Sequence, residues 1–121
     1  HQVTYRSHDG HLHELWWNGA NPVSHWDLSA ISGAPPAASD PVGHYSPATN
    51  TKHVYYRSAD GHLNEIWWVP GGGVPAHMDL SVYALAPLAA DKPTAFALAG
   101  QGSEHLLYRG ADGQLHEIWW I

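Results

Sequence analysis

Residues 52–68 of this chain read KHVYYRSADGHLNEIWW, and related stretches occur at residues 1–17 (HQVTYRSHDGHLHELWW) and 104–120 (EHLLYRGADGQLHEIWW). The three copies lie about 52 residues apart. The segments between them also match, because the Asp-Leu-Ser of residues 27–29 recurs at residues 79–81. Self-similarity at such a period is typical of repeat architectures such as propellers.

Each copy contains an Asp-Gly dipeptide between two runs rich in aromatic and branched residues: Asp9-Gly10, Asp60-Gly61 and Asp112-Gly113. Asp-Gly supplies the positive φ that a tight hairpin turn needs, so each copy predicts a β-hairpin. In the second copy, residues 54–57 and 63–68 read as its two strands, too short for helices. Residues 43–46 before the hairpin and the polar stretch ending at residues 79–81 read as a first and a fourth strand, and no helix is predicted.

Four short antiparallel strands per repeat, with Gly and Pro between repeats, predict an all-β β-propeller of four-stranded blades, about 2.5 per chain. The repeats define a partial blade at 1–32, a full blade at 33–84 and a partial blade at 85–121, with three, four and three strands. Partial blades expose apolar faces and raw sheet edges. We therefore expect closure by homo-oligomerisation, with a dimer preferred over a trimer.

Composition excludes several classes of function. Five Lys and Arg and a formal net charge of -6 leave no basic cluster for a nucleic acid. No apolar run approaches the roughly 18 residues of a membrane span. With no Cys, the chain cannot form disulfides or Cys-based zinc sites. No secretion signal opens the sequence, and motifs for catalysis or for nucleotide cofactors are missing, so we predict no enzyme and no cofactor.

Each repeat carries the motif Tyr-Arg-x-x-Asp-Gly-x-Leu-x-Glu-x-Trp-Trp, and the first two repeats continue with Asp-Leu-Ser and an Ala-Pro linker. The repeats together span the whole chain. The motif resembles the repeats of the fucose-binding β-propeller lectins of fungi and bacteria and of their actinobacterial relatives. The resemblance implies a six- or seven-bladed, extracellular lectin, in some members assembled from short chains, that binds monosaccharides in clefts between adjacent blades. It further implies that Glu14, Glu65 and Glu117 accept hydrogen bonds from sugar hydroxyls and that Trp17, Trp68 and Trp120 stack on the sugar.

Residues three apart on a strand point to opposite faces of the sheet, so the Glu and Trp of one copy serve different clefts. Glu14 would then meet Trp68, and Glu65 would meet Trp120. Glu117 would meet a Trp17 that belongs to another copy of the chain. Assembly would therefore complete the last site.

Two positions depart from the fucose-binding members. An Arg early in the second strand of each blade, which pairs with the Glu in those lectins, is matched by Val3, Val54 and Leu106. The second site aromatic, on the fourth strand, is matched by Val23 and Val74. Arg6, Arg57 and Arg109 lie three residues further on and are candidates for the charged contact with the sugar, with a structural hydrogen-bond bridge as the alternative role.

Structural roles stay open beside the binding roles. The Glu could cap its hairpin or pair with Arg, and the first Trp of each pair (Trp16, Trp67 and Trp119) is expected in the core. His11 and His13 share a strand face, but the pair is not repeated, so we expect exposed histidines and no metal site. The predicted function is a multivalent lectin for a monosaccharide such as fucose, for a methylated sugar or for glycan ends. The alternatives are a protein-interaction propeller and an accessory module of a larger secreted protein.

Overall fold

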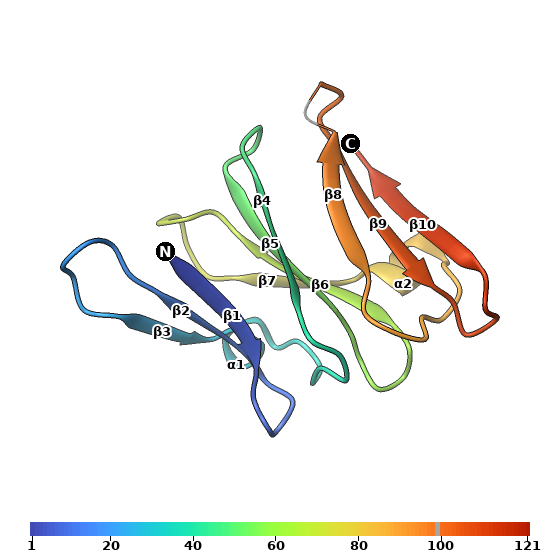
Figure 1. The fold of residues 1–121 in the computed structure, drawn as a ribbon, viewed down its shortest axis with the longest axis horizontal. Coiled ribbons are helices and arrows are strands. Elements are labelled where there is room, and N and C mark those ends of the chain that lie inside the picture. The colour runs from blue at the N-terminus through green and yellow to red at the C-terminus, as the bar shows by residue number, and fades with distance from the viewer. Residues whose placement is uncertain (99) are drawn as a thin grey trace.

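The computed structural model describes residues 1–98 and 100–121, which form three antiparallel sheets that lie side by side (Figure 1). Sheet 1 consists of β1 (Gln2–Arg6), β2 (Leu12–Trp16) and β3 (Ser24–Asp27). Sheet 2 consists of β4 (Val42–Ser46), β5 (Thr51–Arg57), β6 (Leu63–Trp68) and β7 (Ala76–Asp79). Sheet 3 consists of β8 (Thr94–Leu98), β9 (Ser103–Arg109) and β10 (Leu115–Trp120).

The predicted strand counts of three, four and three are confirmed. Sheet 1 starts with the second strand of its repeat, and sheet 3 stops after the third strand. Within the described residues the sheets stay open and do not close into a barrel. Closure into a propeller therefore stays a prediction.

The Asp-Gly dipeptides form the tips of the hairpins, as predicted. In sheet 2, the backbone N–H of Gly61 donates to the carbonyl of Ser58 at 3.0 Å, and Gly61 has a φ of 87°. Asp60 Oδ1 accepts a hydrogen bond from the backbone N–H of His62 at 3.1 Å. The turn is therefore fixed by an Asx contact and by a glycine in a left-handed conformation.

The Ala-Pro linker ties each hairpin to the next sheet. The backbone N–H of Ala89 donates to the carbonyl of Gly61 at 2.8 Å, and the Tyr108 hydroxyl donates to the carbonyl of Pro87 at 2.8 Å. A Cβ atom on Gly61 would lie only 3.2 Å from Leu88 Cβ. The glycine is thus required by the close approach of the linker as well as by the turn.

The prediction that the chain has no helix is wrong at two places. Short helices α1 (Leu28–Ser32) and α2 (Leu80–Ala84) follow the last strands of sheets 1 and 2. Asp79 Oδ1 accepts a hydrogen bond from the backbone N–H of Val82 at 3.0 Å, and Asp27 caps α1 in the same way. Asp is a favoured N-cap residue, so each strand ends at the Asp and a helix begins at the following Leu, where the sequence pattern predicts that the strand continues. Neither helix of the described chain has the length and apolar character needed to cross a bilayer.

Two hydrophobic clusters fill the spaces between neighbouring sheets. The cluster between sheets 1 and 2 contains Leu12, Leu28, Ala37, Val54, Tyr56, Ile66 and Trp68. The cluster between sheets 2 and 3 contains Tyr55, Leu63, Leu80, Ala89, Leu106, Tyr108 and Ile118. Because successive strand residues point to opposite faces, Tyr55 and Tyr56 enter different clusters, and sheet 2 is buried on both faces.

The outer faces of sheets 1 and 3 expose residues whose repeat equivalents are buried. Tyr5 on sheet 1 is 38% exposed, whereas its equivalent Tyr56 is fully buried. Leu115 on sheet 3 is 84% exposed, whereas its equivalent Leu63 is fully buried. The two open faces therefore correspond to the two sheet faces that meet at each internal interface.

Candidate functional site

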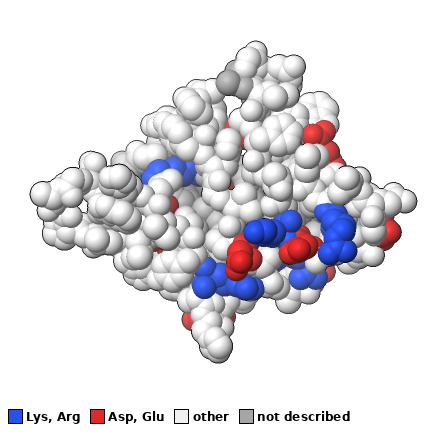
Figure 2. Space-filling model, in the orientation of Figure 1, with Lys and Arg blue, Asp and Glu red and all other residues white. Residues whose placement is uncertain are grey.

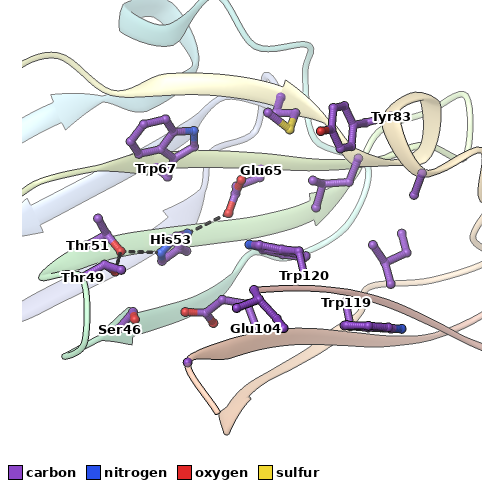
Figure 3. Close-up of a pocket in the computed structure, with 16 residues that line it drawn as sticks. Ser46, Thr49, Thr51, His53, Glu65, Trp67, Tyr83, Glu104, Trp119 and Trp120 are labelled. Carbon is purple, nitrogen blue, oxygen red and sulfur yellow. Dashed lines mark hydrogen bonds and ion pairs between the residues drawn. The ribbon is translucent and has the colours of Figure 1, made fainter. Parts of the chain in front are cut away.

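Two pockets lie between the sheets, one at each internal interface. Pocket A, between sheets 1 and 2, has a volume of about 470 Å³. Pocket B, between sheets 2 and 3, has a volume of about 630 Å³ and is shown in Figure 3. Pocket A is lined by Glu14 and Trp68, and pocket B by Glu65 and Trp120. Each pocket therefore combines the Glu of one sheet with the second Trp of the next.

The remaining members of the predicted pairs face the open sides of the molecule. Glu117 lies on the outer face of sheet 3, and its side chain is 39% exposed. Trp17 lies on the outer side of sheet 1, stacked on the His1 ring with 5.5 Å between ring centroids. The described chain does not bring Glu117 and Trp17 together. The role of all six residues in sugar binding stays a prediction.

A chain of hydrogen bonds leads to the carboxylate of pocket B. Thr51 Oγ1 lies 2.6 Å from Thr49 Oγ1 and 2.7 Å from His53 Nε2. His53 Nδ1 lies 2.7 Å from Glu65 Oε2, and both side chains are buried. A neutral His53 that donates a hydrogen bond from Nδ1 to Glu65 accepts one at Nε2 from the Thr51 hydroxyl. This chain holds the Glu65 carboxylate in one orientation at the wall of the pocket (Figure 3).

Sheet 3 repeats this arrangement, and sheet 1 lacks it. Ser103 Oγ lies 2.9 Å from His105 Nε2, and His105 Nδ1 lies 3.1 Å from Glu117 Oε2. In sheet 1 the equivalent of the histidine is Gln2. Glu14 therefore faces pocket A without a histidine partner.

Val54 and Leu106, two of the residues matched to the Glu-pairing Arg, point away from the Glu of their own sheet. Val54 and Leu106 are 2% and 0% exposed and belong to the hydrophobic clusters. The neighbouring histidines face the opposite way and contact the Glu, because β5 and β6 pair Tyr55 with Glu65 and so place His53 diagonally beside that carboxylate. Sequence reasoning missed these histidines, although their i, i+2 spacing from Thr51 and Ser103 was a visible signal.

The three arginines predicted as alternative sugar contacts line neither pocket. Arg57 Nε donates to the carbonyl of Ala89 at 2.7 Å, and an Arg6 nitrogen lies 3.2 Å from Asp40 Oδ1. Both arginines, like Arg109, stand where a strand enters its Asp-Gly hairpin. Figure 2 shows Lys and Arg interspersed with Asp and Glu in the lower part of the molecule, where Figure 1 places the hairpin tips. The structure therefore gives Arg6 and Arg57 bridging contacts at that end.

In sheets 2 and 3 the second Trp of each pair packs in the core, and the first does not. Trp68 is 4% exposed and Trp120 packs against the second cluster, whereas Trp119 is 59% exposed. Trp16 lines pocket A and Trp67 lines pocket B. The expectation that the first Trp is a core residue is therefore wrong, because that residue shares the strand face of the pocket Glu.

Pocket A also has an aromatic wall that the sequence pattern did not identify. Val23 and Val74, matched to the fourth-strand aromatic, are 60% and 72% exposed and lie outside both pockets. The fourth-strand residue that reaches pocket A is Trp26, which pairs with Glu14 across β2 and β3. Its ring centroid lies 5.0 Å from that of Trp16 and 6.2 Å from that of Trp68. In pocket B the same position is Met78.

The pocket carboxylates differ in their surroundings. Burial raises the pKa of Glu14, and the nearby charge of Lys52 partly opposes this effect. Pocket B holds a second carboxylate, Glu104, whose Oε2 lies 2.8 Å from His44 Nε2 without the angle of a hydrogen bond. Burial raises the pKa of Tyr55, and the charges of Glu65 and Glu104 raise it further. Both carboxylates therefore act on one buried phenol beside pocket B.

The clustered histidines of sheet 1 contact neighbouring side chains. His11 Nδ1 lies 2.8 Å from Asp27 Oδ2, and His13 Nδ1 lies 2.9 Å from His25 Nε2. Within the described residues no group of three or more His, Cys, Asp or Glu side chains is arranged to hold a metal ion.

We expect the pKa of His11 to lie above the ordinary histidine value of 6.5 and the pKa of His77 to lie below it. The hydrogen bond from Asp27 raises the pKa of His11 from 6.5, whereas burial lowers the pKa of His77 from the same value. The His11 contribution to stability is therefore full below pH 6.5 and is lost as the pH rises through the folded-state pKa. Histidine NMR titration of Asp27→Asn, which keeps a good N-cap, should show a lower pKa for His11 and no change for His77. An unchanged His11 would contradict the pairing.

Comparison with known proteins yields a similarity of fold. No protein-family model and no curated protein matches the chain. Among solved structures, the chain is similar to a fucose lectin from Kordia zhangzhouensis determined in complex with methyl-fucoside, with a TM-score of 0.68 and 19% sequence identity. The match covers 98% of this chain and 82% of the lectin. The chain therefore has a fucose-lectin-like fold.

Proposed function

We propose that this chain is a non-enzymatic lectin that binds monosaccharides in pockets between neighbouring blades of a β-propeller. The observation that carries the proposal is the repeated pairing of a buried Glu from one sheet with a Trp from the next, Glu14 with Trp68 and Glu65 with Trp120. A carboxylate accepts hydrogen bonds from hydroxyls, and an indole covers an apolar sugar face. The fold similarity to a solved fucose lectin supports the same function.

Pocket B has the features expected of a preorganised site. His53 Nδ1 lies 2.7 Å from Glu65 Oε2 and orients the carboxylate, which would accept a hydrogen bond from a ligand hydroxyl. Because Glu65 is already oriented, sugar binding orders few additional side chains, and the entropic cost of binding is small. Trp67 and Trp120 supply the apolar part of the lining.

The proposal includes association of the open face of sheet 3 with the open face of sheet 1 of another copy. These faces expose Leu115 and Tyr5, whose equivalents Leu63 and Tyr56 are buried at the internal interfaces. An interface that joins two different faces is heterologous and closes into a ring when its rotation permits. Glu117 would then share a pocket with Trp17 of the neighbouring copy, most simply in a dimer of six sheets.

Tryptophan fluorescence titration tests the binding function, since Trp16, Trp67 and Trp68 line the pockets. We expect saturable changes with at least one of fucose, an O-methylated monosaccharide, galactose and mannose. Xylitol serves as an acyclic polyol control, because it lacks the flat apolar face of a pyranose. Equal, non-saturating responses to every compound would contradict the proposal.

A further inference from the structure

One position of the repeat carries a positive charge in pocket A and a negative charge in pocket B. The residue four places before the repeated Tyr is His1, Lys52 or Glu104 in the three copies. Alternation along β5 and β9 turns this position toward the preceding sheet, on the same face as Val54 in sheet 2 and Leu106 in sheet 3. Lys52 therefore lines pocket A, and Glu104 lines the equivalent wall of pocket B.

The ammonium of Lys52 is available to a ligand. The acidic and basic lining of pocket A consists of Glu14 and Lys52, beside Trp16, Trp26 and Trp68. Among the described residues, no carboxylate lies within 4.0 Å of the Lys52 ammonium. Lys52 nevertheless lowers the pKa of Glu14 against the effect of burial, so its charge reaches into the pocket.

Pocket B presents the opposite charge at the same place. Glu65 and Glu104 both line it, and His53 already uses one oxygen of Glu65. A negatively charged ligand placed beside Glu104 would meet a buried like charge, which costs far more free energy than a mismatch in open solvent. A neutral ligand meets no such penalty.

We propose that pocket A binds a sugar that carries a carboxylate, such as a uronic acid or a sialic acid, with Lys52 as its counter-ion, and that pocket B rejects this ligand. The proposal rests on the lectin function proposed above. Trp68 or Trp26 stacks on the ring, Glu14 accepts a hydroxyl hydrogen bond, and the ligand carboxylate points to Lys52. A lysine ammonium is a compact point charge that pairs with a carboxylate without demanding a bidentate geometry.

Matched pairs of ligands test the assignment. The probes are methyl glucuronide and methyl glucoside, methyl galacturonide and methyl galactoside, and the methyl glycoside of N-acetylneuraminic acid, measured by calorimetry with the full chain. The first two pairs differ only by a carboxylate in place of a hydroxymethyl group. At least one carboxylated sugar should bind about tenfold more tightly, or better, than its neutral partner where the probe has one. The affinity of the carboxylated sugar should fall as the salt concentration rises.

Four variants assign the effect to residues. Lys52→Glu and Lys52→Met should each weaken the binding of the carboxylated sugar to pocket A about tenfold or more. The charge reversal should have the larger effect. Glu104→Lys should add a second site for the carboxylated sugar per chain. The control Lys92→Glu makes the same charge change as Lys52→Glu, but at an exposed residue outside both pockets. It should change neither the affinity for the carboxylated sugar nor the number of sites. Circular dichroism of each variant checks that it is folded.

The outcomes separate this inference from the proposed function. The inference is overturned if neutral sugars bind but no carboxylated probe does, or if folded Lys52→Met and Lys92→Glu bind the carboxylated sugar equally well. In both cases the lectin function stands. If no sugar of either kind binds, the lectin function and the inference fail together.

Discussion

Replacement of Glu65 by Gln is expected to weaken the binding of a neutral monosaccharide in pocket B by roughly 10–100-fold, since a hydrogen bond to a charged group contributes about 1.5–3 kcal/mol. Gln keeps the shape of the side chain but removes the negative charge. It also replaces the acceptor held by His53 at 2.7 Å with a neutral amide group. The measurement is the dissociation constant of the sugar identified in the fluorescence titration.

The reciprocal control is Glu14→Gln, which makes the same change in pocket A. It should leave the affinity of pocket B unchanged, because Glu14 lies on a different sheet and lines only pocket A. Calorimetry of both variants should show the loss of a different class of site in each. Unchanged affinity at both pockets would show that the two carboxylates are structural.

Leu63→Ala is expected to lower the free energy of unfolding by about 2–5 kcal/mol, as is usual when a buried leucine is truncated. Leu63 is fully buried between sheets 2 and 3, in the cluster that includes Leu106 and Ile118. Urea unfolding followed by tryptophan fluorescence measures the change. A loss of this size would make Leu63 one of the main contributors to the internal interface.

The matched control is Leu115→Ala, the same substitution at the equivalent position of sheet 3, where the side chain is 84% exposed. In a chain with its open faces free, this change should cost under about 0.5 kcal/mol. If a second copy covers Leu115, the variant should instead weaken association, seen as a lower mass at a given concentration in light scattering. Equal stability losses in both variants at a concentration where the chain is monomeric would contradict the described burial.

Sequence periodicity was sufficient to predict the sheets but not the helices. The Asp-Gly dipeptides between runs rich in aromatic and branched residues predicted the three Asp-Gly hairpins, because a turn dipeptide and strand propensity are local signals. The helices were missed because the strands were expected to run through residues 27–29 and 79–81, whereas they end at Asp27 and Asp79, each of which also caps a helix. A five-residue helix has too few turns to produce a helical period in the sequence.

The candidate site was predicted in part. The opposite orientation of Glu and Trp follows from strand alternation, and it places Glu14 near Trp68 and Glu65 near Trp120. The histidine beside Glu65 depends on the diagonal pairing of two strands, and a residue pattern alone does not set the register of that pairing. Likewise, Lys52 and Glu104 reach the pockets only because the preceding sheet packs on their strand face.

The central claim is that equivalent sugar sites lie between neighbouring sheets, and native mass spectrometry tests it most directly. Spectra of the protein alone and with fucose, an O-methylated sugar, galactose, mannose and the carboxylated probes report the assembly and the number of bound ligands together. The account predicts an oligomer that carries several sugars, with one more site class per chain than the two internal pockets supply. A monomer at micromolar concentration that binds no sugar would contradict it.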